Sequence, residues 1–391
     1  MVITKCPGSD IDLFSDDVLR NRYPMYKRLR DAGSVVFMRS LNVYALPRYQ
    51  DVREALSNWE VFSSARGVAL TDSVNEMIIG NTLDSDPPKH DQLRRVLQRP
   101  LTAPALRALT EQIETEAEKL VESLVIKQSF DAVTDLAQYL PVSIVSNLVG
   151  LPEEGRERML DWASAAFNSL GPANARCLVA MEISRGLVDY IFHYLTPDML
   201  KENSWAAMAL AAARDGELTE EEARGLLLDY VGPSLDTTIL ATASAIWLFG
   251  RNPVQWDIMR SDHSLVSGAI DEVLRLESPI QCFSRHVTRD HMIEGSVMPA
   301  GSRVLVMYGS ANRDERKWQD PERFDVLRSA TDHLAFGHGV HKCVGNLLAK
   351  LEIKALLSAL LRHVKHFELG VEQPIINNML HGFAHLEVTI N

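Results

Sequence analysis

The sequence has few cysteines, and their arrangement does not define a class of protein by itself. Its 391 residues contain four, Cys6, Cys177, Cys282 and Cys343, and none of them belongs to a CxxC pair. This scatter argues against a zinc site and against a disulfide framework. An isolated cysteine is most often a small buried hydrophobe, so any other role has to follow from its neighbours.

Long apolar runs and an excess of basic residues are absent as well. No apolar run approaches the ~20 residues that a membrane span needs. The N-terminal segment MVITKCPGSDIDLFSDD lacks the basic start and the apolar stretch of a secretion signal. The formal net charge is -12, which disfavours binding to nucleic acid. The sequence therefore predicts a cytoplasmic protein that binds neither membranes nor nucleic acid.

Apolar residues make up 46% of the chain, which can supply a large core. Their spacing predicts a helix-rich fold with small β elements and without the βαβ alternation of a doubly wound sheet. No repeat or flexible linker divides the chain. The segments expected to be regular are helices at about 104–125, 152–170, 255–277 and 344–362, a hairpin within 34–46 and short strands within 285–308.

The longest helix signal contains its own interruption. Thr219 and Glu222 form a capping box before an apolar run that continues to Gly250. Pro233 stands inside this run, and proline removes a backbone donor and clashes with the preceding turn. We therefore expect one long helix that is kinked at Pro233.

The segment HLAFGHGVHKCVGN, residues 333–346, surrounds Cys343 with glycines and precedes a helix. Glycine lets the backbone approach a sulfur closely, and the positive end of a helix dipole favours a thiolate. FGHGVHKCVG resembles the haem-binding loop of the cytochrome P450 family, FGxGxHxCxG, at every fixed position. The resemblance implies a single domain over residues 1–391, mainly α with small β-sheets. In it, Cys343 would ligate the iron of haem b, next to Phe336 and Gly345.

Two further motifs follow in the family's order. Glu272 and Arg275 resemble the family's ExxR pair, although any exposed helix can carry such a pair. Arg323, in PERF, resembles the arginine that completes a buried ion network with them. Removing one partner of that network would leave a buried charge unpaired, at about 3–5 kcal/mol.

The resemblance also implies which side chains hold the haem propionates. They are His90, Arg94, Arg285 and His341. His90 and Arg94 lie one turn apart on a helix, and the alternative for this pair is a solvated basic face.

The interrupted helix carries the residues that the family uses to supply protons. A thiolate-ligated haem iron activates O2, and a carboxylate beside a hydroxyl can relay the two protons needed from water. Asp236 and Thr237 match the family's acid–alcohol pair. A hydrogen bond from Thr237 to a helix carbonyl is the alternative, and it is compatible with the relay. Where the family usually has Ala-Gly, this chain has Pro233 and Ser234, which could order a water or crowd the O2 site.

The resemblance implies that electrons come ultimately from NAD(P)H through a separate 2Fe–2S ferredoxin and its flavin reductase. The sequence ends 48 residues after Cys343, so we expect no fused reductase. Such ferredoxins are acidic, so we expect a locally basic face near the cysteine loop; solvated surface cations are the alternative. The candidates are Lys342, Lys350, Lys354, Arg95 and Arg99.

Several stretches, among them LNVYALPRY and ESPIQCFSRHVTRD, are similar to bacterial P450s that oxidise para-substituted benzoates, often by O-demethylation. Carried over by position, these stretches imply an apolar pocket for a small, flat aromatic substrate. Its lining residues would be Leu83, Ala166, Phe167, Leu170, Ile280, Phe283 and Leu380.

That branch grips the substrate carboxylate with arginines and serines, and here the sequence departs from it. The corresponding residues are Met77, Gly80, Leu228, Asp229 and Gly232. A buried benzoate would find no partner among them. We therefore expect a neutral aromatic, such as a phenol or aryl ether, or an amine that pairs with Asp229. The alternatives are that Asp229 faces solvent or another helix, or that the alignment around 73–82 is displaced.

The leading interpretation is a monooxygenase that hydroxylates or demethylates such a substrate with O2. A peroxygenase driven by H2O2 is a second interpretation, but such members usually lack the acid–alcohol pair. A haem-thiolate gas or redox sensor is a third. It would need an output domain or a DNA-binding motif, and the sequence has neither.

Overall fold

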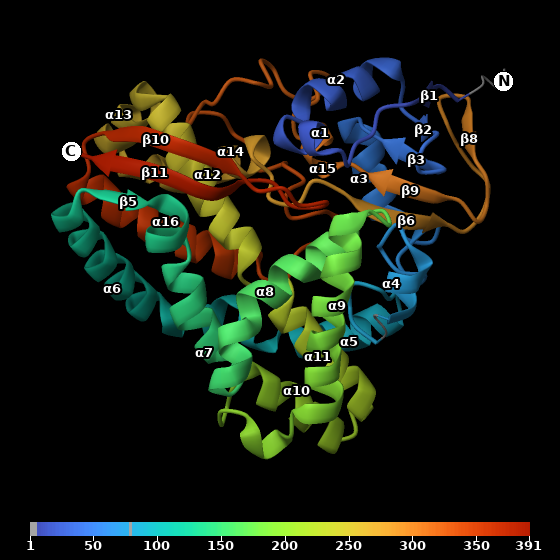
Figure 1. Ribbon diagram of the computed structural model, residues 1–391, viewed down its shortest axis with the longest axis horizontal. Coiled ribbons are helices and arrows are strands. Elements are labelled where there is room, and N and C mark those ends of the chain that lie inside the picture. The colour runs from blue at the N-terminus through green and yellow to red at the C-terminus, as the bar shows by residue number, and fades with distance from the viewer. Residues whose placement is uncertain (1–5, 78–79) are drawn as a thin grey trace.

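The computed structural model describes residues 6–77 and 80–391. Figure 1 shows a body of helices that narrows toward α10, with a mixed sheet at the side where the N-terminus lies. The α-helices of the described residues are α1 (Asp16–Arg20), α2 (Tyr23–Ala32), α3 (Tyr49–Ser57), α4 (Asp72–Met77), α5 (Lys89–Leu97), α6 (Ala103–Lys127), α7 (Ser146–Val149), α8 (Glu153–Ser169), α9 (Ala175–Asp189), α10 (Trp205–Arg214), α11 (Glu220–Val231), α12 (Asp236–Arg251), α13 (Pro253–Ser261), α14 (Val266–Leu276), α15 (Tyr308–Ala311) and α16 (Asn346–His363).

The strands form small sheets, of which the largest mixes parallel and antiparallel pairs and the others are antiparallel. The largest has the order β1-β2-β3-β9-β6-β4, a second has the order β10-β11-β5, and β7 pairs with β8. The hairpin expected within 34–46 is confirmed as β2 and β3, with Phe37 opposite Tyr44. The strands are β1 (Gly8–Ser9), β2 (Val36–Met38), β3 (Val43–Leu46), β4 (Phe62–Ser63), β5 (Ser129–Asp131), β6 (Phe283–Val287), β7 (His291–Ile293), β8 (Ser296–Met298), β9 (Arg303–Val306), β10 (Phe367–Pro374) and β11 (Phe383–Ile390).

The helices expected at 104–125, 152–170 and 344–362 are confirmed as α6, α8 and α16. The single helix expected at 255–277 is wrong, because the chain turns between α13 and α14. Asp262 lies in an extended conformation, with φ of -145°. Its carboxylate accepts a hydrogen bond from the backbone N–H of Ser264 at 2.9 Å. An aspartate that bonds locally in this way competes with the helical hydrogen bonds, so it ends one helix and starts the next.

The capping box is confirmed, but the long helix is broken rather than kinked. Thr219 N–H donates to Glu222 Oε2 at 2.9 Å, and Glu222 N–H donates to Thr219 Oγ1 at 3.2 Å. α11 ends at Val231 and α12 starts only at Asp236. Pro233 lies in the gap, where it has no N–H to continue the ladder. The break leaves non-helical backbone in the middle of the molecule.

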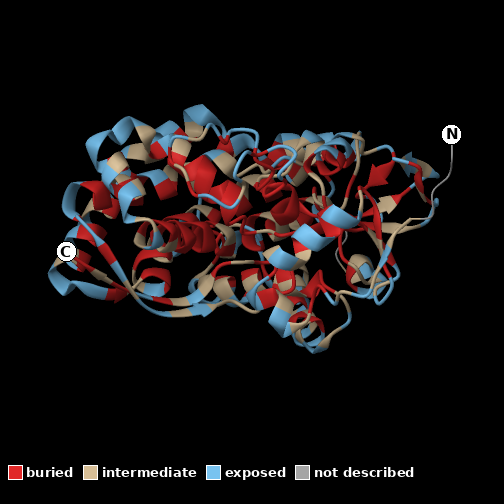
Figure 2. Cartoon of the chain, turned by 90° about the horizontal axis from the view of Figure 1, so that it is seen from above, coloured by how far each residue is buried: buried red, intermediate tan, exposed pale blue. Residues whose placement is uncertain are grey.

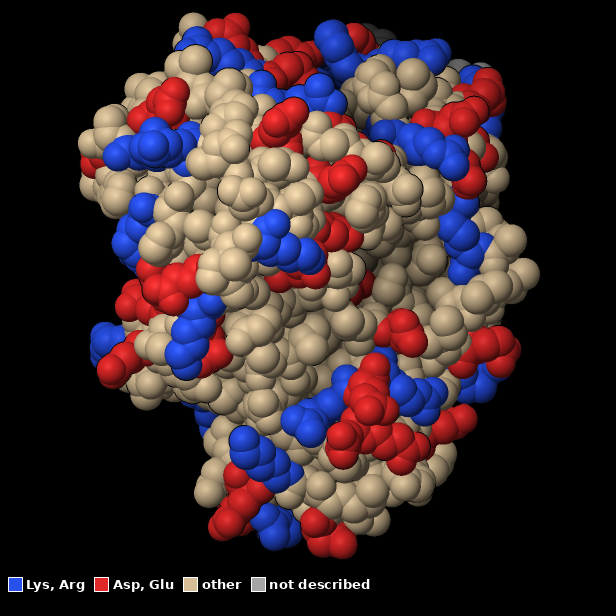
Figure 3. All heavy atoms as spheres, turned by 60° about the vertical axis from the view of Figure 1, so that its left-hand side comes forward, with Lys and Arg blue, Asp and Glu red and all other residues tan. Residues whose placement is uncertain are grey.

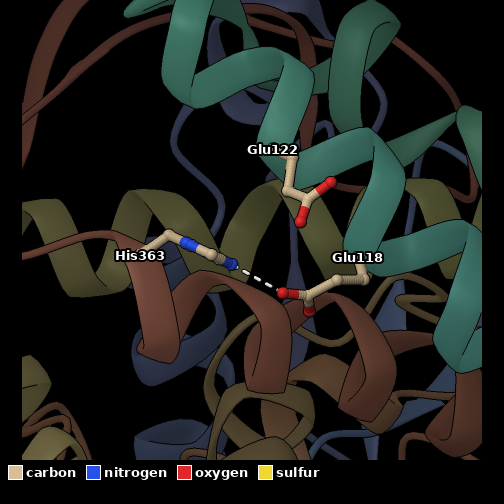
Figure 4. Close-up of side chains that lie close together, drawn as sticks. All are labelled: Glu118, Glu122 and His363. Atoms are coloured by element: carbon tan, nitrogen blue, oxygen red, sulfur yellow. Dashed lines mark hydrogen bonds and ion pairs between the residues drawn. The ribbon is translucent and has the colours of Figure 1, made fainter.

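The core follows α12, whose side chains are mostly buried, and Figure 2 shows buried residues concentrated along the middle of the molecule. α6 and α16 lie beside each other, and Figure 4 shows one ionic contact between them. His363 Nε2 lies 2.6 Å from Glu118 Oε1, and Arg362 Nε donates to Glu118 Oε2 at 3.1 Å. Among the described residues, we find no helix that combines the length and the apolarity of a membrane span.

The loop between α8 and α9 is tied to the segment that precedes β11. Asn378 Nδ2 donates to the carbonyl of Asn168 at 2.8 Å, and Asn378 N–H donates to Asn168 Oδ1 at 3.0 Å. Asn174 Nδ2 donates to Asn378 Oδ1 at 2.9 Å. Gly171 leaves room for this contact, since a Cβ there would lie 2.4 Å from Asn378 Nδ2. We call these contacts the asparagine clasp.

Candidate active site

A cavity of about 290 Å³ lies beside the break between α11 and α12. One wall is the loop that carries Cys343, and another is α5, which presents His90 and Arg94. The opposite wall combines Phe167 and Leu170, near the end of α8, with Phe283 of β6. The structure thus brings together residues that are more than 250 positions apart in the sequence.

The cysteine loop directs hydrogen-bond donors at the sulfur of Cys343. Cys343 N–H donates to the carbonyl of Phe336 at 2.8 Å, which closes the loop. Burial raises the pKa of the Cys343 thiol, while hydrogen bonds from the backbone of Gly345 and Asn346 and the charge of Arg94 lower it. Donors and a cation that favour the thiolate suit a sulfur that ligates a metal.

Gly339 and Gly337 give this loop its shape, and they allow a matched test. Both have positive φ, +70° and +68°. A Cβ on Gly339 would lie 2.2 Å from the carbonyl oxygen of Leu56, whereas the nearest atom to a Cβ on Gly337 is 3.6 Å away.

We expect Gly337→Ala to lower the free energy of unfolding by about 1–2 kcal/mol, the usual penalty of the left-handed conformation. Gly339→Ala should lower it by about 1–3 kcal/mol more, because backbone has to move. Chemical denaturation of both variants, together with the haem each retains on gel filtration, measures the difference. Equal losses would contradict the close approach to Leu56.

Four basic side chains line the cavity next to the cysteine loop. The rings of His90 and His341 lie 4.6 Å apart, and the Nε2 atoms of both are buried without a hydrogen-bond partner among the described residues. Arg94 Nη2 donates to the carbonyl of Lys342 at 2.6 Å, and Arg285 Nη1 donates to that of Ser284 at 2.8 Å. Burial, with the charges of the neighbouring bases, lowers the pKa of His341 to about 2.

This donor set fits haem. The buried guanidinium of Arg285, the half-buried guanidinium of Arg94 and two unpaired imidazole nitrogens suit a ligand with two carboxylates, because bidentate and charge-assisted hydrogen bonds are strong. The thiol of Cys343 lines the same cavity and suits the ligand's iron. Cys343, His90, Arg94, Arg285 and His341 could therefore hold the group between them.

Comparisons with known proteins agree with this fit. The model of the family "Cytochrome P450" matches residues 250–390. The chain is 36% identical over 389 residues to "Cytochrome p450 CYP199A2" of Rhodopseudomonas palustris, covering 98% of this chain and 94% of that protein. This chain belongs to the cytochrome P450 family. It is a haem-dependent monooxygenase of the bacterial kind, and it uses O2.

Two further proteins support the assignment of this chain to the P450 family and its fold. The "Cytochrome P450 monooxygenase PikC" of Streptomyces venezuelae is 30% identical over 394 residues, which cover 98% of this chain and 94% of that protein. The structure of CYP109E1 from Bacillus megaterium in complex with testosterone has a TM-score of 0.86 and covers 96% of this chain and all of that one. At 24% identity, the latter supports the fold alone.

The ion network behind the cysteine loop contains a different arginine from the one expected. Glu272 and Arg275 form a fully buried pair, with Arg275 Nε 2.7 Å from Glu272 Oε2. Arg328 completes it, with Nε 3.0 Å from Glu272 Oε1. The side chain of Arg323 is 63% exposed and reaches only Asp325, at 3.7 Å. The expectation for Arg323 was wrong, because the turn that follows PERF brings Arg328 back to Glu272 instead.

Asp236 and Thr237 lie in the first turn of α12 but face different surroundings. Thr237 lines the cavity, and its hydroxyl donates to the carbonyl of Pro233 at 3.1 Å. The carboxyl of Asp236 instead faces α8: burial raises its pKa to about 7, a hydrogen bond with Ser164 lowers it, and the charge of Asp161 raises it. Ser234 also lines the cavity, with its hydroxyl turned to the carbonyl of Val231 at 3.4 Å.

Most of the residues expected in the substrate pocket line the cavity. Two do not: Gly80 lies in an outer groove, and the buried Leu380 pairs with Ile280 across an isolated bridge. The residues that do line it are Met77, Leu83, Ala166, Phe167, Leu170, Leu228, Asp229, Gly232, Ile280 and Phe283.

Two acidic residues of the cavity escaped the sequence analysis. Asp84 lines both the cavity and the outer groove. Glu352, on α16, is buried, and burial raises its pKa to about 8. Its Oε1 is without a hydrogen-bond partner in the described part of the chain. The sequence offers little sign of either residue, because acids at helix and loop positions are usually solvated.

The surface near Cys343 is less basic than expected. Lys350 is paired with Asp271 at 2.5 Å, and Arg99 is paired with Glu217. Arg95, Lys342 and Lys354 are exposed, and we find no ion pair for them within residues 6–77 and 80–391. On the face seen in Figure 3, acidic and basic side chains are interspersed and do not form one basic field.

One group of side chains away from the cavity could approach a metal ion. Glu118, Glu122 and His363 bring their ligand atoms within 4.8 Å of one another (Figure 4). Both oxygens of Glu118 are already used by Arg362 and His363. These side chains are therefore better described as an ion-pair cluster between α6 and α16.

Proposed function

We propose that this P450 inserts one oxygen atom of O2 into a small aromatic substrate that lacks a carboxylate, by hydroxylation or by oxidative O- or N-demethylation. One observation carries the proposal, namely the lining of the cavity. Phe167, Leu170 and Phe283 offer an apolar wall, and Asp229 lines the cavity at a position where the resemblance places a group that grips the benzoate carboxylate. A buried carboxylate facing Asp229 would be unpaired, which is strongly unfavourable.

In this proposal residues 1–391 act as one domain that holds haem b. Cys343, which lies between Phe336 and Gly345 in the sequence, would ligate the iron, and the bases of α5, β6 and the cysteine loop would hold the propionates. Bound in this way, haem supplies the activation of O2 at its iron. Glu272, Arg275 and Arg328 fix the segment behind the loop, so that the sulfur keeps its position.

For an aryl methyl ether the reaction balances as follows. ArOCH3, O2, two electrons and two protons give ArOCH2OH and water. The hemiacetal then loses formaldehyde and leaves ArOH. A C–H bond of the methyl group is replaced by C–OH, and the second oxygen atom leaves as water. The electrons come from NAD(P)H through a flavin reductase and a separate 2Fe–2S ferredoxin, in the cytoplasm.

Thr237 hands on the two protons from within the cavity, and Asp236, whose carboxyl faces α8, replenishes them from outside it. Thr237 donates its hydroxyl hydrogen to Pro233, so its oxygen can accept a hydrogen bond from a water in the cavity. Asp236 has its pKa raised to about 7 by burial. It can therefore give up a proton and regain one near neutral pH. Arg95, Lys342 and Lys354 are the cations left free to attract an acidic ferredoxin.

The test measures how much product forms for each NADH that is consumed. With 4-methoxybenzyl alcohol, ferredoxin, reductase and NADH, the wild type should release one formaldehyde per NADH consumed. Thr237→Ala should lower this ratio by about 100-fold, the lower end of the range for proton-transfer catalysis, and release H2O2 instead.

Thr242→Ala is the matched control. Thr242 lies on the same helix, with its hydroxyl bonded to the carbonyl of Thr238 at 2.8 Å, and it does not line the cavity. The ratio of formaldehyde released to NADH consumed should be the same in Thr242→Ala as in the wild type. NADH consumption without any oxidised product from aryl ethers, phenols or amines would overturn the proposed function.

A further inference from the structure

The cavity holds more acidic than basic charge once its two arginines are paired with the haem propionates. Arg94 and Arg285 line it from α5 and β6, and so do three acids, Asp84, Asp229 and Glu352. This step rests on the proposed function: the two propionates of haem b match the two guanidinium charges. Near neutral pH Glu352, whose pKa burial raises to about 8, is mostly protonated, so Asp229 and Asp84 are the two acids left without a full counter-charge in an otherwise apolar cavity.

Asp229 has one oxygen that is held and one that is available. Its Oδ2 accepts hydrogen bonds from Thr82 N–H at 2.9 Å and from Thr82 Oγ1 at 2.6 Å. Its Oδ1 has no hydrogen bond to any described residue. Thr82 therefore fixes the direction of the carboxylate, because two bonds to one oxygen restrict its rotation.

Asp84 places a second carboxylate in the same part of the cavity. Its Oδ1 accepts a hydrogen bond from Val68 N–H at 3.0 Å. Burial, with the charge of Asp229, raises the pKa of Asp84 to about 7. Burial likewise raises the pKa of Asp229 to about 6. Each acid is stabilised by an arginine that the haem would share, Asp84 by Arg285 and Asp229 by Arg94.

We propose that Asp229 and Asp84 form a cation subsite that binds the ammonium group of an aryl-alkylamine substrate. The ammonium donates to Asp229 Oδ1, and Asp84 adds a second negative charge. The aromatic ring packs against the wall formed by Phe167 and Phe283, whose rings are nearly parallel with centroids 6.4 Å apart. A small aromatic compound with a protonated amine at one end can therefore pair with the two acids and pack against the aromatic wall.

The experiment compares three ligands of one shape in the ferric holoenzyme. The ligands are 4-methoxybenzylamine, 4-methoxybenzyl alcohol and 4-methoxybenzoate, and binding is followed by calorimetry and by the low- to high-spin Soret shift. The amine should bind about 10- to 100-fold tighter than the alcohol, as a charge-assisted hydrogen bond allows. The benzoate should bind most weakly.

Three variants separate charge from structure. Asp229→Asn keeps an oxygen for both bonds from Thr82 but removes the charge, so the preference for the amine should fall about 10-fold or more, with the alcohol affected less than about 2-fold. Asp84→Asn should reduce the preference by a smaller factor. Thr82→Val removes one bond to Asp229 but keeps the charge, so the preference should remain.

Several results would overturn the subsite. They are an equal loss for amine and alcohol in Asp229→Asn, tightest binding of the benzoate, or a spectrum in which the amine nitrogen ligates the iron. If the alcohol is still demethylated while the amine shows no preference, the subsite fails and the proposed function stands. If none of the three ligands binds, the aromatic substrate class fails, and the subsite fails with it.

Discussion

Arg275→Ala should lower the free energy of unfolding by about 3–5 kcal/mol, which is the usual result of removing one partner from a buried ion pair. Glu272 and Arg275 are both completely buried. Arg275 also donates to the carbonyls of Asn312 and Pro321, each at 2.8 Å. The variant would therefore leave Glu272 Oε2 and two carbonyls without their partner, while Arg328 still contacts Glu272 Oε1. Chemical denaturation of the holoenzyme measures the loss.

Arg323 and Arg328 provide the controls for this prediction. Arg323 is mostly exposed, so Arg323→Ala should change stability by no more than about 0.5 kcal/mol. Arg328→Ala removes one charged hydrogen bond to Glu272 and should cost about 1.5–3 kcal/mol. The expected order of loss is Arg275, then Arg328, then Arg323. A larger loss for Arg323 than for Arg328 would restore the original motif assignment and contradict the described network.

Cys343→Ser should abolish monooxygenation, because serine has no thiolate to push electron density toward the iron. The change is nearly isosteric, and the closing bond from the backbone of residue 343 to Phe336 does not depend on the side chain. The fold should therefore survive. The decisive measurement is the spectrum of the reduced, carbon monoxide-bound protein, in which the red-shifted Soret band of a thiolate-ligated haem should disappear.

Cys177→Ser is the matched control for that experiment. The Cys177 thiol donates to the carbonyl of Ser169 at 3.2 Å, a bond that a serine hydroxyl can replace. Cys177 is buried and does not line the cavity. This variant should keep both the spectrum and the turnover of the wild type. A red-shifted band that survives in Cys343→Ser would show that another group ligates the iron.

The features that the sequence predicted well depend on local rules. A capping box needs only Thr219 and Glu222 three positions apart, and the helix periodicity of 104–125 needs only its own apolar residues. The cysteine loop belongs to the same group as far as the positive φ of Gly337 and Gly339 is concerned, whereas the approach of Leu56 to Gly339 depends on the fold. The interruption at Pro233 was predicted at the right position, but as a kink and not as a full break. A proline shows where a helical hydrogen bond is lost, but it does not show how far apart the two helices end and begin.

The features that the sequence missed depend on long-range packing. Arg323 and Arg328 are close together in the sequence, and only the folded turn decides which of them reaches Glu272. Asp236 follows the family's spacing, but the direction of its carboxyl depends on Ser164 in α8. Asp84 joins the cavity because α11 brings Asp229 against the loop that precedes α5. No pattern within one segment contains that information.

The asparagine clasp bears on how the wall of the cavity can move. Phe167 and Leu170 line the cavity from the same end of α8 that the clasp secures through Asn168. Any opening at this corner must break several hydrogen bonds together, because the same side chain of Asn378 serves both Asn168 and Asn174. Linked bonds of this kind open as a unit and not one at a time. The cavity wall formed by Phe167 and Leu170 therefore keeps its shape for as long as the asparagine clasp is closed, and it can move only when these bonds break together.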